Sequence, residues 1–356
     1  MTTLAHLTSL SSLRRILPTV AGFDVFGGAP MLEVSGAAGD DVVTVSYATG
    51  DRTGHLRIPA TVVESFTRRL DGASMAAAVR TLAPTLGGAD AGATITRPDR
   101  ARLTLTRDRT SAVVDEYVGG GGRFTRWVAP TSEMTVTVPA AAVSRAYRDL
   151  HSLVLPKGNA ATGQGWATTH VAIGTSAGSV CLWATNRYVA VRRRLADSGG
   201  DGTIDGLIDT STLGLVAAAI TAGDDAPVTI TAGGGRVTLT GSTYRFAYIT
   251  SATDSYPRMT SLVGGDYAAT GTLSLRAAER TALPEATVVR ARGGRLLVGD
   301  IDAGAARGDG DEITVNGRHL AAAVAVLRGT ATAYIRPGML RLSSTTTDAA
   351  VVRLRP

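Results

Sequence analysis

One pattern recurs along the chain: a short apolar or alternating segment, followed by apolar residues at helical spacing. It occurs six times in the 356 residues, at intervals of about 60 residues, near the period of known repeat architectures. The expected helices begin near residues 4, 59, 139, 210, 274 and 317, and a strand precedes all but the first. The apolar face of each helix must pack on something. The 42 glycines and the frequent Thr and Val favour turns and strands over long helices, so we expect an α+β chain rather than a helical bundle.

The expected helices rest on apolar residues spaced three and four positions apart. Pro59 and Pro139 suit a first helical position because the missing N–H of proline would be unpaired there. Asp209 or Thr210 would cap the fourth helix. The apolar positions are Leu4, Leu7, Leu10, Leu13, Leu17 and Val20 in the first helix, Val62, Val63, Phe66 and Leu70 in the second, Val143, Tyr147, Leu150 and Val154 in the third, Leu213, Val216 and Ile220 in the fourth, and Leu320, Val324 and Leu327 in the sixth, while the fifth follows Leu273.

Alternating segments divided by turn residues lie between the helices and predict antiparallel strands. They include His55–Ile58, Ala226–Thr231, Arg236–Thr240, Thr243–Thr250, Ala286–Ala291, Arg295–Ile301, Thr330–Arg336, Leu340–Ser344 and Ala349–Arg355. Paired two by two, the six units make three domains, each with two helices on one side of a sheet system. We expect these domains at residues 1–130, 131–257 and 258–356.

The charge of the chain favours an acidic partner. The formal net charge is +6, and Lys157 is the only lysine among 36 basic residues. On helices that pack their apolar stripe inward, the arginines of the opposite stripe would face outward and attract phosphates without reading bases. The alternative is an ordinary solvated surface, and the fourth helix supplies no cation. The candidate DNA-facing residues are Arg14, Arg15, Arg68, Arg69, Arg145, Arg148, Arg276, Arg280 and Arg318.

Catalytic and metal-binding patterns are not found in the sequence. The five histidines have no metal-ligand spacing, and Cys181 is the only cysteine, which excludes an intrachain disulfide and a thiolate cage and fits a reducing cytosol. The run Gly119–Gly122 lacks the Lys-Ser/Thr of a phosphate-binding loop, and no Gly-x-Ser-x-Gly elbow is placed at a strand-to-helix turn. We therefore expect no enzyme, no cofactor and no metal. Because Arg14 and Arg15 interrupt the apolar N-terminal pattern, we also expect a cytoplasmic protein without a signal peptide or membrane span.

Four short segments resemble bacterial DNA sliding clamps, the β subunit of DNA polymerase III, in order and spacing along nearly the whole chain. The most specific is Ala184-Thr185-Asn186-Arg187-Tyr188, which is similar to the Ala-Thr-Asp-Arg/Gly-Tyr/His segment of that family. The others are Ser255-Tyr256-Pro257 before the third domain, the helix start Asn316-Gly317-Arg318-His319-Leu320, and the closing segment Val351-Val352-Arg353-Leu354-Arg355.

The resemblance implies a non-catalytic processivity factor with the three-domain clamp fold. Such a protein forms a head-to-tail ring, as a homodimer, that encircles double-stranded DNA without sequence preference. It would tether the replicative DNA polymerase and bind the clamp loader and other proteins with clamp-binding motifs through a peptide pocket. Carried over position by position, the pocket residues are Thr185, Arg187, Tyr188, Pro257, Val352, Arg353 and Leu354.

The sequence departs from the family at several of these positions. Asn186 stands where the family has Asp, Arg258 replaces an acidic residue after Pro257, and Pro284 shortens the first helix of the third domain. Partner motif and chromosomal, plasmid or phage origin stay open. The alternative from another class is a repetitive β-rich structural module, such as a phage-particle component, whose arginines only aid solubility. A hydrolase is the third possibility, and it would need a cluster of catalytic groups that the sequence does not show.

Overall fold

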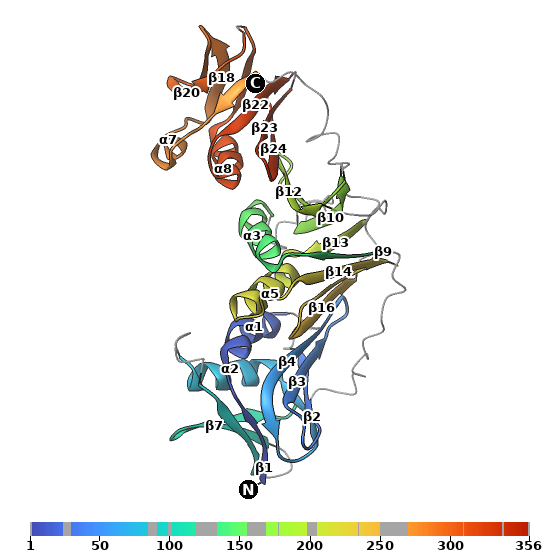
Figure 1. The fold of residues 1–356 in the computed structure, drawn as a ribbon. Coiled ribbons are helices and arrows are strands. Elements are labelled where there is room, and N and C mark those ends of the chain that lie inside the picture. Colours follow the sequence, from blue (N-terminus) through green and yellow to red (C-terminus); the bar gives the residue numbers. More distant parts are fainter. Residues whose placement is uncertain are drawn as a thin grey trace. The chain divides into compact units, whose positions relative to one another are not determined.

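The protein is an α+β chain in which every strand pair among the described residues is antiparallel (Figure 1). The computed structural model describes residues 2–23, 30–84, 91–98, 102–117, 134–154, 169–176, 178–197, 205–233, 235–249, 270–308, 310–336 and 338–354. Two compact units are present. The first comprises Met1–Ser144 and Ser211–Thr250, and the second comprises Arg145–Thr210 and Ser251–Pro356.

The first unit is built on a 12-stranded sheet with the order β8-β7-β6-β1-β4-β16-β15-β14-β9, to which β2, β3 and β5 add a branch. Helices α1 and α2 pack on each other through apolar faces that include Leu13, Ile16 and Met75. Its elements are β1 (Thr2–Leu7), α1 (Ser11–Ala21), β2 (Met31–Gly36), β3 (Val42–Ala48), β4 (Arg52–Val62), β5 (Phe66–Asp71), α2 (Gly72–Leu82), β6 (Ala93–Arg97), β7 (Arg102–Arg107), β8 (Thr110–Asp115), β9 (Met134–Val138), α5 (Thr210–Thr221), β14 (Val228–Gly233), β15 (Arg236–Thr240) and β16 (Tyr244–Ile249).

The second unit has an eight-stranded sheet, β13-β10-β11-β12-β24-β23-β22-β17, and a four-stranded sheet, β20-β19-β18-β21. Helix α8 packs on β24, β12 and β21, with Leu320, Val324 and Leu327 buried. The elements are α3 (Ala140–Leu150, of which Arg145 onward belongs to this unit), the 3₁₀ turn His151–Leu153, β10 (His170–Ser176), β11 (Ser179–Thr185), β12 (Val189–Asp197), β13 (Asp205–Asp209), β17 (Gly271–Leu273), α7 (Ala277–Thr281), β18 (Ala286–Arg292), β19 (Arg295–Val298), β20 (Ile301–Ala305), β21 (Glu312–Asn316), α8 (Gly317–Leu327), β22 (Ala331–Arg336), β23 (Met339–Ser343) and β24 (Thr347–Val352).

Both large sheets join segments that the sequence assigned to different domains. Strand β4 pairs with β16, and β12 pairs with β24 with Val189 opposite Val351. The backbone hydrogen bonds of each sheet therefore continue across the expected boundaries at residues 130 and 257. The division into three domains stays a prediction.

The expectation of a second helix from Pro59 is wrong. Strand β4 runs through Pro59, which lies opposite Val42, and its side chains alternate between buried and exposed as far as Val62. This period of two is typical of a strand with one buried face. The helix of this region is α2, which starts later, where the Asp71 carboxylate accepts a hydrogen bond from Ser74 N at 2.7 Å.

Other expectations differ in their limits. The apolar pattern from Leu4 is a strand, β1, followed by helix α1 from Ser11, so the first expected helix starts too early. The expected strand from Arg295 to Ile301 is two strands, because the chain turns at Gly299, whose φ of 60° favours glycine. The expected helices at α3, α5 and α8 are confirmed.

Candidate functional site

The arginines predicted to face DNA lie in different local environments. Arg145 and Arg148 are exposed on α3, and Arg318 is exposed on the first turn of α8, as the helical spacing predicted. Arg276 precedes α7, where Glu279 accepts hydrogen bonds from its backbone N and from Nε, both at 2.7 Å. Arg280 is half-buried and donates to Leu275 O at 3.0 Å.

Four predicted arginines in the first unit differ from the expectation. Arg14 and Arg15 are half-buried on α1, and Arg14 Nε donates to Ala83 O at 2.8 Å, beyond the end of α2. Arg68 and Arg69 lie on strand β5 instead of a helix, because the helix expected there is absent. Their nearest carboxylates are Glu116, 3.9 Å from Arg68 Nε, and Glu33, 3.7 Å from Arg69 Nε. The expected helical placement is therefore wrong for Arg68 and Arg69, whereas Arg14 and Arg15 lie on a helix as expected but are half-buried.

The structure brings together most of the residues that the resemblance assigned to a peptide pocket. The turn between β11 and β12 holds Thr185, Arg187 and Tyr188, and it is fastened to the C-terminal strand because Val352 N donates to Tyr188 O at 2.9 Å. Beyond β24, Arg353 N donates to Gly338 O and Leu354 N to Thr314 O, each at 2.9 Å. Pro257, the remaining predicted pocket residue, lies outside the described residues.

Local hydrogen bonds account for the shape of this turn. The Asn186 carboxamide accepts from Tyr188 N at 3.1 Å and from Val189 N at 2.8 Å. Thr185 Oγ1 donates to Val189 O at 2.9 Å and accepts from Arg187 N at 3.1 Å. Arg187 has a φ of 79°, which is costly for a residue with a side chain. The turn therefore holds Tyr188 outward, where its neighbours in sequence do not cover it.

Tyr188 and Val352, which are exposed, lie beside the half-buried His319, and we call these three residues the Tyr188 surface. The Tyr188 ring stacks on the His319 ring of α8, with centroids 4.7 Å apart and planes inclined by 12°. Tyr188 is 56% exposed and Val352 is 42% exposed, and the two residues are joined by the hydrogen bond from Val352 N to Tyr188 O. Burial lowers the pKa of His319 below its ordinary value, so the ring is neutral at neutral pH. The stacked rings of Tyr188 and His319 are uncharged, and the His319 ring is partly buried. Such a surface suits contact with an extended apolar peptide.

His319 was not among the predicted site residues, although the segment Asn316–Leu320 was recognised as a helix start. The sequence signal that could have pointed to His319 is Asn316, a residue type that favours helix N-caps. Asn316 Oδ1 accepts from Arg318 N at 3.0 Å and from His319 N at 3.3 Å, which fixes the first turn of α8. A residue held at this turn can face the loop that packs beside the helix start.

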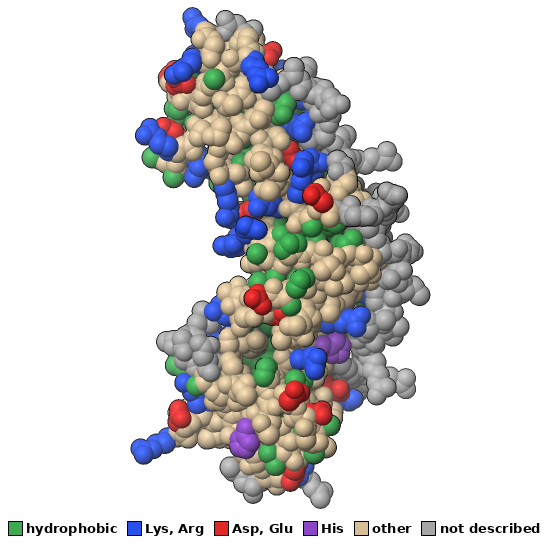
Figure 2. All heavy atoms as spheres, viewed as in Figure 1, with side chains coloured by type: hydrophobic (Ala, Val, Ile, Leu, Met, Phe, Trp, Pro, Cys, Tyr) green, Lys and Arg blue, Asp and Glu red, His purple; other side chains and the backbone are tan. Residues whose placement is uncertain are grey.

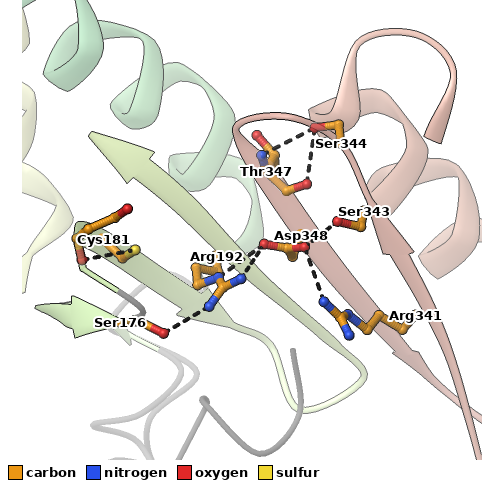
Figure 3. Close-up of polar contacts among 9 residues, drawn as sticks. Ser176, Cys181, Arg192, Arg341, Ser343, Ser344, Thr347 and Asp348 are labelled. Carbon is orange, nitrogen blue, oxygen red and sulfur yellow. Dashed lines mark hydrogen bonds and ion pairs between the residues drawn. The ribbon is translucent and has the colours of Figure 1, made fainter. Parts of the chain in front are cut away.

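A buried ionic network joins β12 to β24 (Figure 3). The Asp348 side chain is 1% exposed and accepts from Arg192 Nε at 3.0 Å and Nη2 at 2.7 Å. Its other oxygen accepts from Ser343 Oγ at 2.6 Å and lies 3.5 Å from Arg341 Nη2. Arg192 also donates to Ser176 Oγ at 2.8 Å. One carboxylate thus ties together three neighbouring strands of the eight-stranded sheet.

The remaining chemistry of the described residues is sparse. Burial raises the pKa of the Cys181 thiol to about 11, so this buried cysteine is a thiol at neutral pH. No group of three or more histidine, cysteine or carboxylate side chains that could hold a metal is found within the described ranges. Over the same ranges, no helix has the length and apolar character needed to cross a membrane.

Comparisons with known proteins identify the fold. No protein-family model matches the sequence, and a search of curated proteins found no match. Solved structures match over the whole chain. The DNA polymerase sliding clamp of Bacillus subtilis has a TM-score of 0.73 at 14% identity, with 100% of both chains covered. The sliding clamp of Pseudomonas aeruginosa has a TM-score of 0.75 at 11% identity, and the DNA polymerase III β subunit of Thermotoga maritima has 0.74 at 10%, each covering 99% of this chain and 100% of the other. The chain therefore has the sliding-clamp fold.

Proposed function

We propose that this protein is a DNA polymerase processivity factor, a non-catalytic sliding clamp that encircles duplex DNA in the cytoplasm. The observation that supports the proposal most is the sliding-clamp fold over the full length of the chain. Fold by itself does not determine function, so the proposal also needs sites of the right chemistry. Exposed arginines on α3 and α8 supply cations that attract phosphates, and the Tyr188 surface supplies a place for a partner.

Within this function the Tyr188 surface is the docking site for the replicative polymerase, the clamp loader and other proteins with clamp-binding motifs. Thr185, Arg187, Tyr188, Val352, Arg353 and Leu354 would line it, together with Pro257. A peptide laid across it would cover Tyr188 and Val352, which are otherwise exposed to water. Three domains per chain, at residues 1–130, 131–257 and 258–356, would give two copies a six-domain closed ring.

Dependence on DNA topology distinguishes encirclement from binding through surface contacts alone. A clamp loaded onto a nicked circular duplex stays bound through a high-salt wash and is released when the circle is linearised. Negative-stain electron microscopy of the purified protein gives the independent readout, and closed six-domain rings are expected. Retention that does not depend on circularity, together with particles lacking a central hole, would contradict the proposal.

A further inference from the structure

A second buried carboxylate, Asp149, lies among arginines that come from three separate elements. Asp149 lies in the last turn of α3, and its side chain is 2% exposed. Arg328 donates to Asp149 Oδ1 from Nε at 3.1 Å and also from Nη2, so that two nitrogens of one guanidinium hold one oxygen. Arg193 Nη1 lies 3.5 Å from Asp149 Oδ2. Each oxygen of the carboxylate therefore faces a different arginine.

The fold directs these arginines to one place. Arg192 and Arg193 are neighbours on β12 and point to opposite faces of the sheet, so Arg192 meets Asp348 while Arg193 meets Asp149. Arg193 also donates to Thr347 Oγ1 on β24. Arg328 follows the last residue of α8 with a φ of 54°, a conformation that ends the helix and is costly for arginine. The hydrogen bonds from the Arg328 guanidinium to Asp149 offset part of this conformational cost.

The cluster carries excess positive charge. Arg145 lies four residues before Asp149 on α3, so the two side chains share one face of the helix. Burial lowers the pKa of Arg193; Asp149 raises it, and Arg145 and Arg328 lower it further. Two guanidinium groups, those of Arg193 and Arg328, contact the one carboxylate, and Arg145 adds a third cation one helical turn before it. The Arg328 side chain is 49% exposed and Arg145 is exposed, so the cluster is accessible from solvent. Figure 2 shows basic side chains gathered in the region that lies between the labelled helices α3 and α8 in Figure 1.

We propose that Asp149 is a positioning residue that holds Arg193 and Arg328 beside Arg145, so that Arg145 and Arg328 bind one backbone phosphate of duplex DNA. This inference rests on the proposed DNA-binding function and deepens it. Guanidinium groups suit a phosphate because their donors are fixed in a plane and can engage two oxygens. An arginine already held in place loses less conformational entropy on binding than a free surface arginine. Arg193, whose side chain is largely buried, adds a third positive charge to the site.

The direction in which Asp149→Asn changes the affinity for DNA distinguishes a positioning role from an effect of net charge alone. Asp149→Asn removes a negative charge, so a surface that works only by net charge would bind DNA more tightly after the change. If Asp149 positions the arginines, the same change weakens binding despite the added positive charge. Arg328→Gln should lower the slope of log affinity against log salt by about 1, the loss of one phosphate contact. Arg328→Lys keeps the charge but loses the two-nitrogen grip on Asp149, and it should also bind less tightly.

The matched control is Arg292→Gln, which removes an equal charge from exposed Arg292 on β18. Affinity for a short linear duplex is measured with the full-length chain across a salt series, and thermal unfolding checks each variant. Because Arg328 is half exposed, its variants test the site even where Asp149→Asn does not fold. Arg328 variants that match the Arg292 control would overturn the positioning role while leaving the clamp function standing. A wild-type chain that binds no duplex would instead contradict the proposed function.

Discussion

Tyr188 and His319 are separated by more than a hundred residues in the sequence, yet their rings stack with centroids 4.7 Å apart. Tyr188 belongs to the turn between β11 and β12, and His319 to the first turn of α8. The stack exists because β12 pairs with β24 and α8 packs on both strands. It places an aromatic pair beside the C-terminal strand.

Replacing Tyr188 by Ala should weaken binding of a peptide that carries a polymerase clamp-binding motif. Large aromatic side chains at the centre of small interfaces dominate affinity, and a loss of about 2 kcal/mol, about 30-fold, is expected. Fluorescence anisotropy with a labelled peptide measures it. Val113→Ala is the control, since Val113 is 52% exposed on β8 and outside the proposed site. Unchanged affinity in Tyr188→Ala would remove this residue from the docking site.

Peptide binding should weaken as the pH falls. Burial lowers the pKa of His319 below 6.5, and a peptide that covers the ring would lower that pKa further. Binding then favours the neutral ring, so affinity is constant above the pKa of the free protein and declines below it. The His319→Phe variant keeps a flat ring without a titrating group. Titrations from about pH 8 to pH 5 should show a decline for wild type that His319→Phe lacks; equal declines in the two proteins would assign the pH effect to another group.

Replacing Asp348 by Ala should destabilise the second unit strongly. The change leaves Arg192 and Arg341 buried without their common carboxylate, and removing one partner of a buried ion pair costs about 3–5 kcal/mol. Urea unfolding followed by circular dichroism should show an earlier transition. Asp302→Ala, at the exposed pair with Arg295, should change stability by less than about 1 kcal/mol. Similar midpoints for the two variants would show that the buried network contributes no more than a surface pair.

Asp224 should make the first unit sensitive to acid. Burial alone would raise the pKa of this carboxyl, but hydrogen bonds from Thr243 N and Oγ1, both 2.7 Å, and from Ser242 Oγ at 2.9 Å lower it below 3.8. A lowered pKa contributes stability that is present above the unfolded value and is lost as the pH falls through the folded value. The Asp224→Asn variant should therefore be less stable than wild type at neutral pH and lose less stability on acidification. Parallel pH–stability curves would exclude this role.

Replacing Arg145 and Arg148 together by Ala should weaken DNA association and reduce its salt dependence without unfolding the protein. Both side chains are exposed on α3, so their removal leaves the packing intact. Each phosphate contact contributes about 0.9 to the slope of log affinity against log salt. The expected measurement is a salt titration of duplex binding with a smaller slope. A slope equal to that of wild type would place these residues away from DNA.

The sequence by itself determined the α+β class, the positions of α3, α5 and α8, and most strands of the last third. These features depend on local periodicity, which a linear pattern carries. The resemblance at Thr185–Tyr188 also located the turn that meets the C-terminal strand.

The helical interpretation of residues 59–70 was wrong, because the apolar residues there fit both a helical and an alternating pattern. Pairing of β4 with β1, β3 and β16 decided between them.

Only the tertiary structure decided which side chains meet. Asp149 and Arg328 are 179 residues apart, and no local signal connects them. Asp149 lies near the end of α3, and Arg328 is the left-handed residue that follows α8. Arg193 on β12 contacts the same carboxylate. The stack of Tyr188 on His319 arises in the same way. Periodicity specifies which face of an element is buried, whereas the partner of a buried or exposed group is set by sheet pairing between distant segments, which a single sequence does not encode locally.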